Sequence, residues 1–374
     1  MTSEQVTWDD CQQLLSNAPR AVAPLDSQAV VLYGAGGKGR ECLGMLQAAG
    51  IWVRAMIDQK PSADIEGVPV CLPEDPLVRR LAVEECIAVV SVFNFNVDPL
   101  PVHCLLASLG FNRVVGMAAL RQLFPVPKTF WLSDSDEMTP PPGAAEWLFH
   151  RLVDGQSRQL FYEALALRRT FEPSWLRCVN QLDQYLPAGI PLPRQGLRFL
   201  DGGAFNGDTI HSLQKSGCTF DAIAAFEPDP ANFLSMQKSV SDSRLKCETL
   251  LWPCGLDSTT RQLRFRSGGV ASSGIDSDGE SFIQTVAIDQ AMPHFRPNYV
   301  KLDIEGAESA AISGMREMLI QSQPNMAVCV YHCPRDLWEL PQAVDELLPD
   351  HKFYLRSHGW NGFDLVLYAC RSGA

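Results

Sequence analysis

Short apolar runs alternate with stretches of helical spacing along most of the chain. The first half holds four such runs, at 29–33, 51–57, 86–92 and 112–116. From residue 197 the rhythm resumes, with strand candidates at 197–200, 222–226, 247–252, 283–288, 298–302, 326–331, 352–356 and 364–369. Runs of this kind are typical of strands buried on both faces. Strands that alternate with helices form βαβ units, so the pattern predicts an α/β protein with a parallel sheet in each half.

The rhythm breaks between residues 124 and 143, where prolines and charged residues cluster. Apolar residues at helical spacing follow over 144–186. A chain of 374 residues is longer than a single hydrophobic core usually supports, which favours more than one domain. Residues 1–24 are a polar lead-in with a short predicted helix. We therefore expect three parts, namely a small Rossmann-like domain at 26–124, a linker and helical connector at 125–195, and a second α/β domain at 196–374.

The richest local pattern follows the strand that ends at Asp201. Gly202, Gly203 and Gly207 come before a helix predicted to start near Asp208. Glycine permits positive φ and a close approach of backbone to ligand, and ligands of open α/β sheets bind beyond the carboxyl ends of the strands. No lysine follows the glycines, which argues against a triphosphate loop.

An acidic residue ends the next predicted strand. Glu227 lies about 20 residues past the glycines, the spacing at which a carboxylate accepts hydrogen bonds from both ribose hydroxyls. The alternative is a solvated charge at a strand end. The sequence Glu-Pro-Asp-Pro favours the site, because the prolines stiffen the backbone beside the carboxylate.

A third cluster of charge ends the predicted strand 298–302. Side chains alternate along a strand, so Lys301 and Asp303 share one face, and Glu305 follows. A buried lysine in a central strand is costly unless it is paired. A binding or catalytic site explains this cluster better than packing does; the alternative is that Asp303 caps the next helix.

Together these runs resemble the FkbM-type methyltransferase family. The resemblance covers roughly 196–370 and rests on Asp201-Gly-Gly-Ala-Phe-Asn-Gly, Phe226-Glu-Pro-Asp-Pro and Lys301-Leu-Asp-Ile-Glu-Gly-Ala-Glu, supported by Ser272-Ser273 and Val286-Ala-Ile-Asp289. The chain departs from the family at Phe205, where asparagine more often follows Gly-Ala directly; here Asn206 comes one residue later. The departure leaves open which side chain contacts the methionine part of the cofactor.

The resemblance implies a class I methyltransferase (Rossmann-like) sheet that binds S-adenosylmethionine and methylates a hydroxyl oxygen of a sugar, glycan or natural product. It places the cofactor's methionine end at the glycine loop and its ribose at Glu227. Asp303 ends the strand expected beside the cofactor strand, so its carboxylate would face the transferred methyl group. The loop residues are Asp201, Gly202, Gly203, Asn206 and Gly207. A hydroxyl must lose its proton, so a base is expected. Asp303 is the first choice, kept ionised by Lys301, and His332 and His358 are the second choices.

The first half carries its own glycine loop. Gly34, Gly36 and Gly39 fit the dinucleotide pattern after a strand, and Asp58 lies 19 residues beyond the last of them. The domain resembles the small nucleotide-binding domain found ahead of some sugar acetyltransferases and FkbM-type proteins, and Gly67-Val-Pro-Val70 fits that resemblance. It would bind a sugar nucleotide, bind NAD or bind nothing. Two alternative functions follow: an NAD-dependent oxidoreductase and a non-catalytic sugar-nucleotide-binding protein.

The composition and net charge limit the kinds of partner that we expect this protein to bind. A net charge of −12 disfavours nucleic acid. No apolar run approaches the ~20 residues that span a bilayer, and the N-terminus lacks an apolar signal core, so we expect a cytoplasmic protein without a membrane partner. Twelve scattered cysteines without a CxxC pair predict reduced thiols and no metal site. The identity of the acceptor and the oligomeric state stay open.

Overall fold

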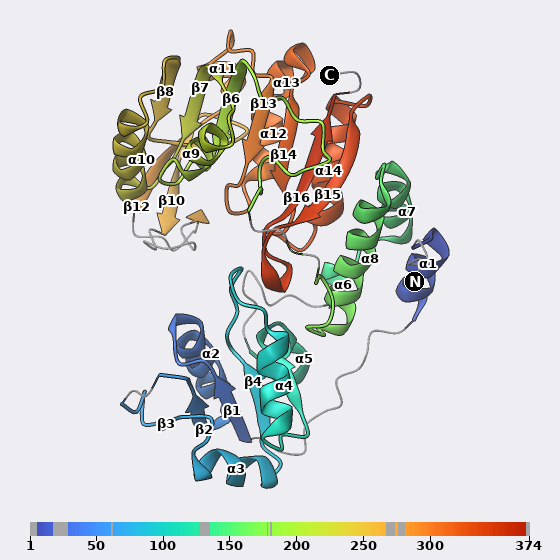
Figure 1. The fold of residues 1–374 in the computed structure, drawn as a ribbon, viewed down its shortest axis with the longest axis vertical. Coiled ribbons are helices and arrows are strands. Elements are labelled where there is room, and N and C mark those ends of the chain that lie inside the picture. The colour runs from blue at the N-terminus through green and yellow to red at the C-terminus, as the bar shows by residue number, and fades with distance from the viewer. Residues whose placement is uncertain are drawn as a thin grey trace. The chain divides into compact units, whose positions relative to one another are not determined.

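The computed structural model describes residues 6–17, 29–60, 63–126, 135–177, 179, 182–266, 274–275 and 281–371. The chain forms two compact units (Figure 1), each built from three segments. The first comprises Met1–Pro142, Arg158–Asn180 and Ser357–Asp364, and the second comprises Gly143–Ser157, Gln181–Arg356 and Leu365–Ala374. The region 125–195, expected as a separate connector, is thus divided between both units. Its helical spacing corresponds to α7 (Pro142–Arg151) and α8 (Gly155–Thr170).

The first unit is built on a five-stranded parallel sheet in the order β3-β2-β1-β4-β5. Its strands are β1 (Ala29–Tyr33), β2 (Trp52–Ile57), β3 (Val70–Cys71), β4 (Ile87–Val90) and β5 (Val114–Gly116). All four predicted runs are confirmed, and only the two-residue β3 was missed. The helices in the first segment of this unit, Met1–Pro142, are α1 (Trp8–Ser16), α2 (Gly37–Ala48), α3 (Pro76–Val83), α4 (Leu100–Ser108), η1 (Met117–Ala119), α5 (Leu120–Leu123) and α6 (Ser135–Met138).

Continuous apolar strands in this sheet follow from burial on both faces. Along β1, Val30 and Leu32 join one core with residues of α2 and α5, whereas Val31 and Tyr33 join a second core with residues of α3 and α4. Alternate side chains therefore enter opposite cores, and no position of the strand interior is left for a polar residue.

The segment Ser357–Asp364 joins the first unit although its neighbours in sequence belong to the second. Phe363 packs edge-on against Phe93, with ring centroids 5.2 Å apart. Trp360 lies in η2 (Trp360–Gly362), and the Cζ atom of Arg177 is 4.8 Å from the centroid of its indole ring. Arg177 also forms an ion pair with Asp98. Sequence periodicity gives no sign of this arrangement, because the contacts join residues far apart in the chain.

The second unit contains a seven-stranded sheet in the order β15-β16-β14-β13-β6-β7-β8 (Figure 1). Its strands are β6 (Leu197–Gly202), β7 (Phe220–Phe226), β8 (Glu248–Trp252), β13 (Tyr299–Leu302), β14 (Asn325–Cys329), β15 (Lys352–Ser357) and β16 (Leu365–Cys370). Its helices after β6 are α9 (Asp208–Lys215), α10 (Pro230–Asp242), α11 (Ile288–Ala291), α12 (Glu308–Gly314), α13 (Arg316–Ser322) and α14 (Asp336–Leu347). Strand β16 runs antiparallel to β14, while β8, β7, β6, β13 and β14 are parallel.

A small second sheet adjoins β8 in sequence. It contains β9 (Gly255–Leu256), β10 (Arg261–Arg266), β11 (Gly274–Ile275) and β12 (Ser281–Val286), in the order β11-β10-β12-β9. The predicted strand at 283–288 lies here rather than in the main sheet, and its last residue starts α11. Ser272 and Ser273 lie outside the described residues.

Parallel pairing places the predicted chemistry at one edge. Strand β13 pairs with β6, and β6 also pairs with β7. The carboxyl ends of these three strands therefore meet at the same edge of the sheet, which brings the glycine loop, Glu227 and Asp303 together. In the described part of the chain, no helix is both long and apolar enough to cross a membrane, and each cysteine is a free thiol.

Two glycines of the first unit's loop make opposite predictions for stability. A Cβ at Gly39 would lie 1.9 Å from the carbonyl oxygen of Gly34, whereas a Cβ at Gly36 would meet nothing within 4 Å. Gly39→Ala should therefore destabilise the unit by roughly 1–3 kcal/mol through overpacking, and the matched variant Gly36→Ala should fold like the parent. Thermal unfolding of both variants checks this; equal melting temperatures would contradict it.

Candidate functional site

The Lys301 ammonium is buried at the centre of the site. Its Nζ lies 2.6 Å from the carbonyl oxygen of Gly203, 3.2 Å from that of Gly202 and 3.2 Å from Oδ1 of Asp201. The strand register explains the last contact, because Lys301 is directly paired with Asp201. Burial alone would lower the pKa of Lys301, but the charges of Asp201 and Asp303 raise it above its usual value. Two donors of the ammonium bind carbonyl oxygens of the loop and its charge pairs with Asp201, so Lys301 clamps the loop to the end of β6.

Asp201 is fully buried at the end of β6. Burial raises the pKa of its carboxyl, and the charge of Lys301 opposes this rise. Apart from this ion pair, neither oxygen accepts a well-formed hydrogen bond from the described residues. Buried polar atoms are nearly always satisfied, so these oxygens have capacity for a donor supplied by a ligand or water.

The loop after β6 needs its glycines for reasons within the chain. A Cβ at Gly203, where φ is +76°, would lie 1.9 Å from the carbonyl oxygen of Asp303. At Gly202 a Cβ would lie 2.9 Å from side-chain carbons of Leu256 and Leu302. Gly207 has φ of +83° and precedes α9, as predicted, and Asn206 is half-buried in the turn before it. The loop therefore packs tightly against the end of β13.

Glu227 is buried directly after β7. Its Oε2 accepts the backbone N–H of Phe205, and its Oε1 accepts that of Asp229, each at 2.9 Å. Burial raises the pKa of Glu227, and these two hydrogen bonds offset part of the rise. With 6% of its surface exposed, Glu227 is not a solvated strand-end charge. Each oxygen accepts one bond and has a second lone pair directed elsewhere, so the carboxylate retains the capacity to bind two hydroxyls.

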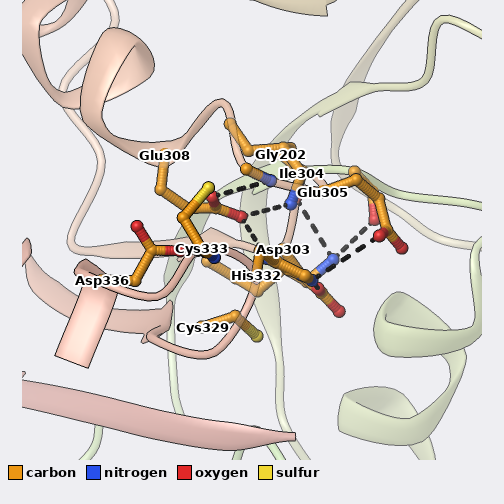
Figure 2. Close-up of polar contacts among 12 residues, drawn as sticks. Gly202, Asp303, Ile304, Glu305, Glu308, Cys329, His332, Cys333 and Asp336 are labelled. Carbon is orange, nitrogen blue, oxygen red and sulfur yellow. Dashed lines mark hydrogen bonds and ion pairs between the residues drawn. The ribbon is translucent and has the colours of Figure 1, made fainter. Parts of the chain in front are cut away.

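Asp303 follows β13 and is held from two sides. The hydroxyl of Tyr185 donates to Oδ2 over 2.8 Å. On the other side, Nε2 of His332 lies 3.3 Å from Oδ1 (Figure 2). Burial would raise the pKa of Asp303, but the hydrogen bond with His332 and the charge of Lys301 outweigh it and hold the pKa well below its usual value. Its side chain is 25% exposed. Asp303 does not cap α12, whose N-cap residue is Ala307.

His332 lies fully buried between two carboxylates. Its Nδ1 is 2.8 Å from Oε1 of Glu308, and its Nε2 is 3.3 Å from Asp303 and 3.8 Å from Oε2 of Glu305 (Figure 2). Each ring nitrogen faces a carboxylate oxygen, an arrangement that favours a proton on both. Burial would lower the pKa of His332, but Glu308 and Asp303 raise it well above its usual value. The raised pKa favours the protonated imidazolium form of His332.

Glu308 and Tyr185 complete the site, and sequence reasoning assigned no role to either. Glu308 contacts His332 and also accepts the backbone N–H groups of Ile304 and Gly306, at 2.8 and 3.0 Å. It thereby fixes the turn after Asp303, where Glu305 has a positive φ of 55°. Glu308 was visible in the motif, but Tyr185 lies in the predicted connector, and nothing local to it signals a contact with Asp303.

The remaining predicted residues belong to the first unit. His358 donates its backbone N–H to the carbonyl of Asp364 there and is not one of the groups around Asp303. Oδ2 of Asp58 accepts the N–H of Ala35 over 2.8 Å, so this acid braces its own glycine loop as Glu227 braces the other. Among the described residues, no group of three or more acidic, histidine or cysteine side chains is arranged to hold a metal ion.

Three comparisons bear on this arrangement. Residues 201–356 match the sequence family described as "Methyltransferase FkbM domain". Hexuronic acid methyltransferase AglP of Haloferax volcanii is 26% identical over 136 residues, which are 35% of this chain and 54% of that protein. The match thus spans about half the length of that relative. The crystal structure of methyltransferase FkbM from Methylobacillus flagellatus KT covers 96% of this chain and 93% of its own, with a TM-score of 0.76 and 21% identity, which shows a shared fold.

The charge state of His332 gives a prediction in pH. A group whose pKa is raised in the folded state stabilises the fold fully below its usual value near 6.5, and this contribution is lost as the pH rises through the raised value. We expect both ring nitrogens of His332 to stay protonated from about pH 5 to 8. ¹⁵N NMR of histidine-labelled protein, assigned with His332→Gln, measures this. A titration of His332 centred near 6.5 would contradict it.

Proposed function

Because residues 201–356 form a methyltransferase domain of the FkbM family, we propose that this protein transfers a methyl group from S-adenosylmethionine to a hydroxyl oxygen of a sugar, glycan or natural product. The observation that carries the proposal is the meeting of three charged groups at one sheet edge. These are the Lys301–Asp201 pair, the buried Glu227, and the partly exposed Asp303.

The residues present fit the cofactor. S-adenosylmethionine supplies an electrophilic methyl group on a sulfonium. Asp201 has buried oxygens with acceptor capacity, suited to an amino group, and Glu227 has capacity for two hydroxyls. Gly203 and Gly207 have positive φ and let the loop backbone turn tightly between these two acids. Asp201, Gly202, Gly203, Asn206, Gly207 and Glu227 would hold the cofactor, and Asp303 would lie at its reactive end.

Asp303 is the proposed partner of the acceptor hydroxyl. Its low pKa makes it a weak base toward a free alcohol, so proton transfer must accompany methyl transfer, when the oxygen becomes strongly acidic. The ionised carboxylate would first accept a hydrogen bond from the hydroxyl and so align the oxygen. The proton would pass to Asp303 as the carbon–oxygen bond forms and the methyl–sulfur bond of the sulfonium breaks, leaving a neutral thioether. It would then pass to solvent through the exposed quarter of the Asp303 side chain. Lys301 and His332 would contribute charge and position, without exchanging protons themselves.

A sugar acceptor is favoured by the name of the archaeal relative, a hexuronic acid methyltransferase. We further propose a nucleotide or sugar nucleotide at Gly34, Gly36, Gly39 and Asp58 of the first unit. The supporting observation is Gly36, whose missing side chain has no packing reason within 4 Å and leaves room for a phosphate. Calorimetric titration with UDP-sugars and with NAD, on the parent and on Gly36→Ala, tests this.

Glu227 gives the first prediction for the cofactor. Glu227→Gln keeps the size but removes the charge, so S-adenosylmethionine should bind about 10- to 100-fold more weakly, the usual cost of a charge-assisted hydrogen bond. Glu248→Gln, an exposed carboxylate at the start of the neighbouring strand β8, is the matched control. Calorimetric titration with S-adenosylmethionine measures both. Unchanged affinity in Glu227→Gln, or no binding by the parent, would refute the assignment.

Asp303 gives the prediction for chemistry. Asp303→Asn should bind S-adenosylmethionine with near-parent affinity and lose roughly 10²- to 10⁴-fold in turnover, as for lost general-base help. Turnover is measured as S-adenosylhomocysteine release with a panel of methyl hexosides and methyl hexuronosides. Asp242→Asn, exposed at the end of α10, is the control. Parent-like turnover in Asp303→Asn would eliminate the base role.

A further inference from the structure

A segment upstream of the family domain is fastened to the main sheet. Tyr299 on β13 donates its buried hydroxyl to the carbonyl oxygen of Tyr185 over 2.6 Å, and Tyr368 on β16 donates to that of Gln184. Leu186 and Ile190 are buried in the same core. The backbone around Tyr185 is therefore fixed by two core hydroxyls, although it precedes residue 201, where the family match begins.

The Tyr185 side chain reaches two charged groups at once. Its hydroxyl donates to Oδ2 of Asp303 over 2.8 Å and accepts from the side-chain amide of Gln184 over 3.1 Å. The amide occupies one side of the phenol oxygen, which directs the phenol proton to Asp303. The aromatic ring lies over the Lys301 ammonium, with its centroid 5.3 Å from Nζ. One side chain thus contacts both the lysine that clamps the glycine loop and the carboxylate proposed to meet the acceptor.

We propose that Tyr185 is a positioning residue of the methyl-transfer site, whose hydroxyl orients the Asp303 carboxylate and whose ring keeps Lys301 on Asp201 and the glycine loop. This inference rests on the proposed function for its catalytic consequence, while the contacts of Tyr185 do not depend on it.

Tyr185 is needed in this role because two carboxylates compete for the Lys301 ammonium. Lys301 is attracted by Asp201 and by Asp303, and both charges contribute to its raised pKa. An ammonium that turned toward Asp303 would release the carbonyls of the loop and occupy the carboxylate that the acceptor needs. The phenol group opposes this twice, since it supplies Asp303 with a neutral donor and gives the ammonium an aromatic face. The titratable groups around Asp303 come from several elements. Lys301 lies on β13, Asp201 on β6 and Cys329 on β14, while His332 follows β14. Tyr185 comes from the upstream segment, and Glu305 and Glu308 follow Asp303 in the chain.

Two substitutions separate the hydroxyl from the ring. Tyr185→Phe keeps the ring, so affinity for S-adenosylmethionine should stay within about twofold of the parent, while turnover falls about 10- to 100-fold, the effect expected of a misplaced reacting group. The Asp303 carboxyl should titrate at higher pH, because one donor to its charged form is gone. Tyr185→Leu removes the ring as well, and it should also weaken cofactor binding more than fivefold. Tyr354→Phe, on β15, is the matched control and should change none of these quantities.

The measurements use the full chain. Calorimetry gives the affinity for S-adenosylmethionine, turnover is followed with the acceptor panel above, and ¹³C NMR of aspartate-labelled protein, assigned with Asp303→Asn, gives the carboxyl titration. Gln184→Leu is a second variant that leaves Tyr185 in place, and it should move the titration in the same direction by less. An unmoved titration in Tyr185→Phe would overturn the inference, as would parent-like turnover in that variant. If the parent neither binds the cofactor nor turns over, the proposed function fails, and the titration still decides the contact between Tyr185 and Asp303.

Discussion

The register between β6 and β13 is the constraint on which the site depends. It places Lys301 directly across from Asp201, so a lysine that would be costly to bury is neutralised by its neighbour on the next strand. The remaining donors of the ammonium bind the carbonyls of Gly202 and Gly203. A slip of one residue would turn Lys301 to the other face of the sheet and leave a buried charge unpaired. The same contact that satisfies the lysine therefore sets the shape of the glycine loop.

From this pair outward, opposite charges alternate through the second unit's site. Asp303 follows Lys301, His332 lies beside Asp303, and Glu308 lies beside His332. Each buried charge has a partner of opposite sign, which limits the cost of bringing the set out of water. The sequence separation of the partners is small only between Lys301 and Asp303, so the set forms only when β6, β13 and β14 are already paired. We infer that ordering of this site follows sheet formation.

Sequence reasoning worked where the signal is local and failed where it is distant. The strand at 197–200 and the strand end before Glu227 are patterns within a few residues, and the strand pairing confirms both strands. The alternation from Lys301 to Asp303 is equally local, and Asp303 follows directly after β13. The strand at 283–288 was detected, but periodicity does not say which sheet a strand joins. Tyr185 was missed because its contact with Asp303 spans 118 residues. His332 was considered as a base because it follows a predicted strand, and its contacts with Asp303, Glu305 and Glu308, 24 or more residues away, leave no local signal.

The glycine loops of the two units share one hydrogen-bonding arrangement. In each, an acid after the second strand accepts a backbone N–H of the loop, Asp58 from Ala35 and Glu227 from Phe205. A carboxylate suits this task, because it satisfies a donor that no strand can reach and still has lone pairs for a ligand.

The glycines of the two loops differ in whether the fold alone requires them. Gly202 and Gly203 are required by close packing and Gly207 by its positive φ, so their presence needs no ligand to explain it. In the first unit Gly34 and Gly39 are required in the same ways, but Gly36 is not. In the second unit, a cofactor is therefore indicated by the charged groups Asp201, Glu227 and Asp303 rather than by the glycines. In the first unit, a ligand would explain Gly36, which neither close packing nor a positive φ requires.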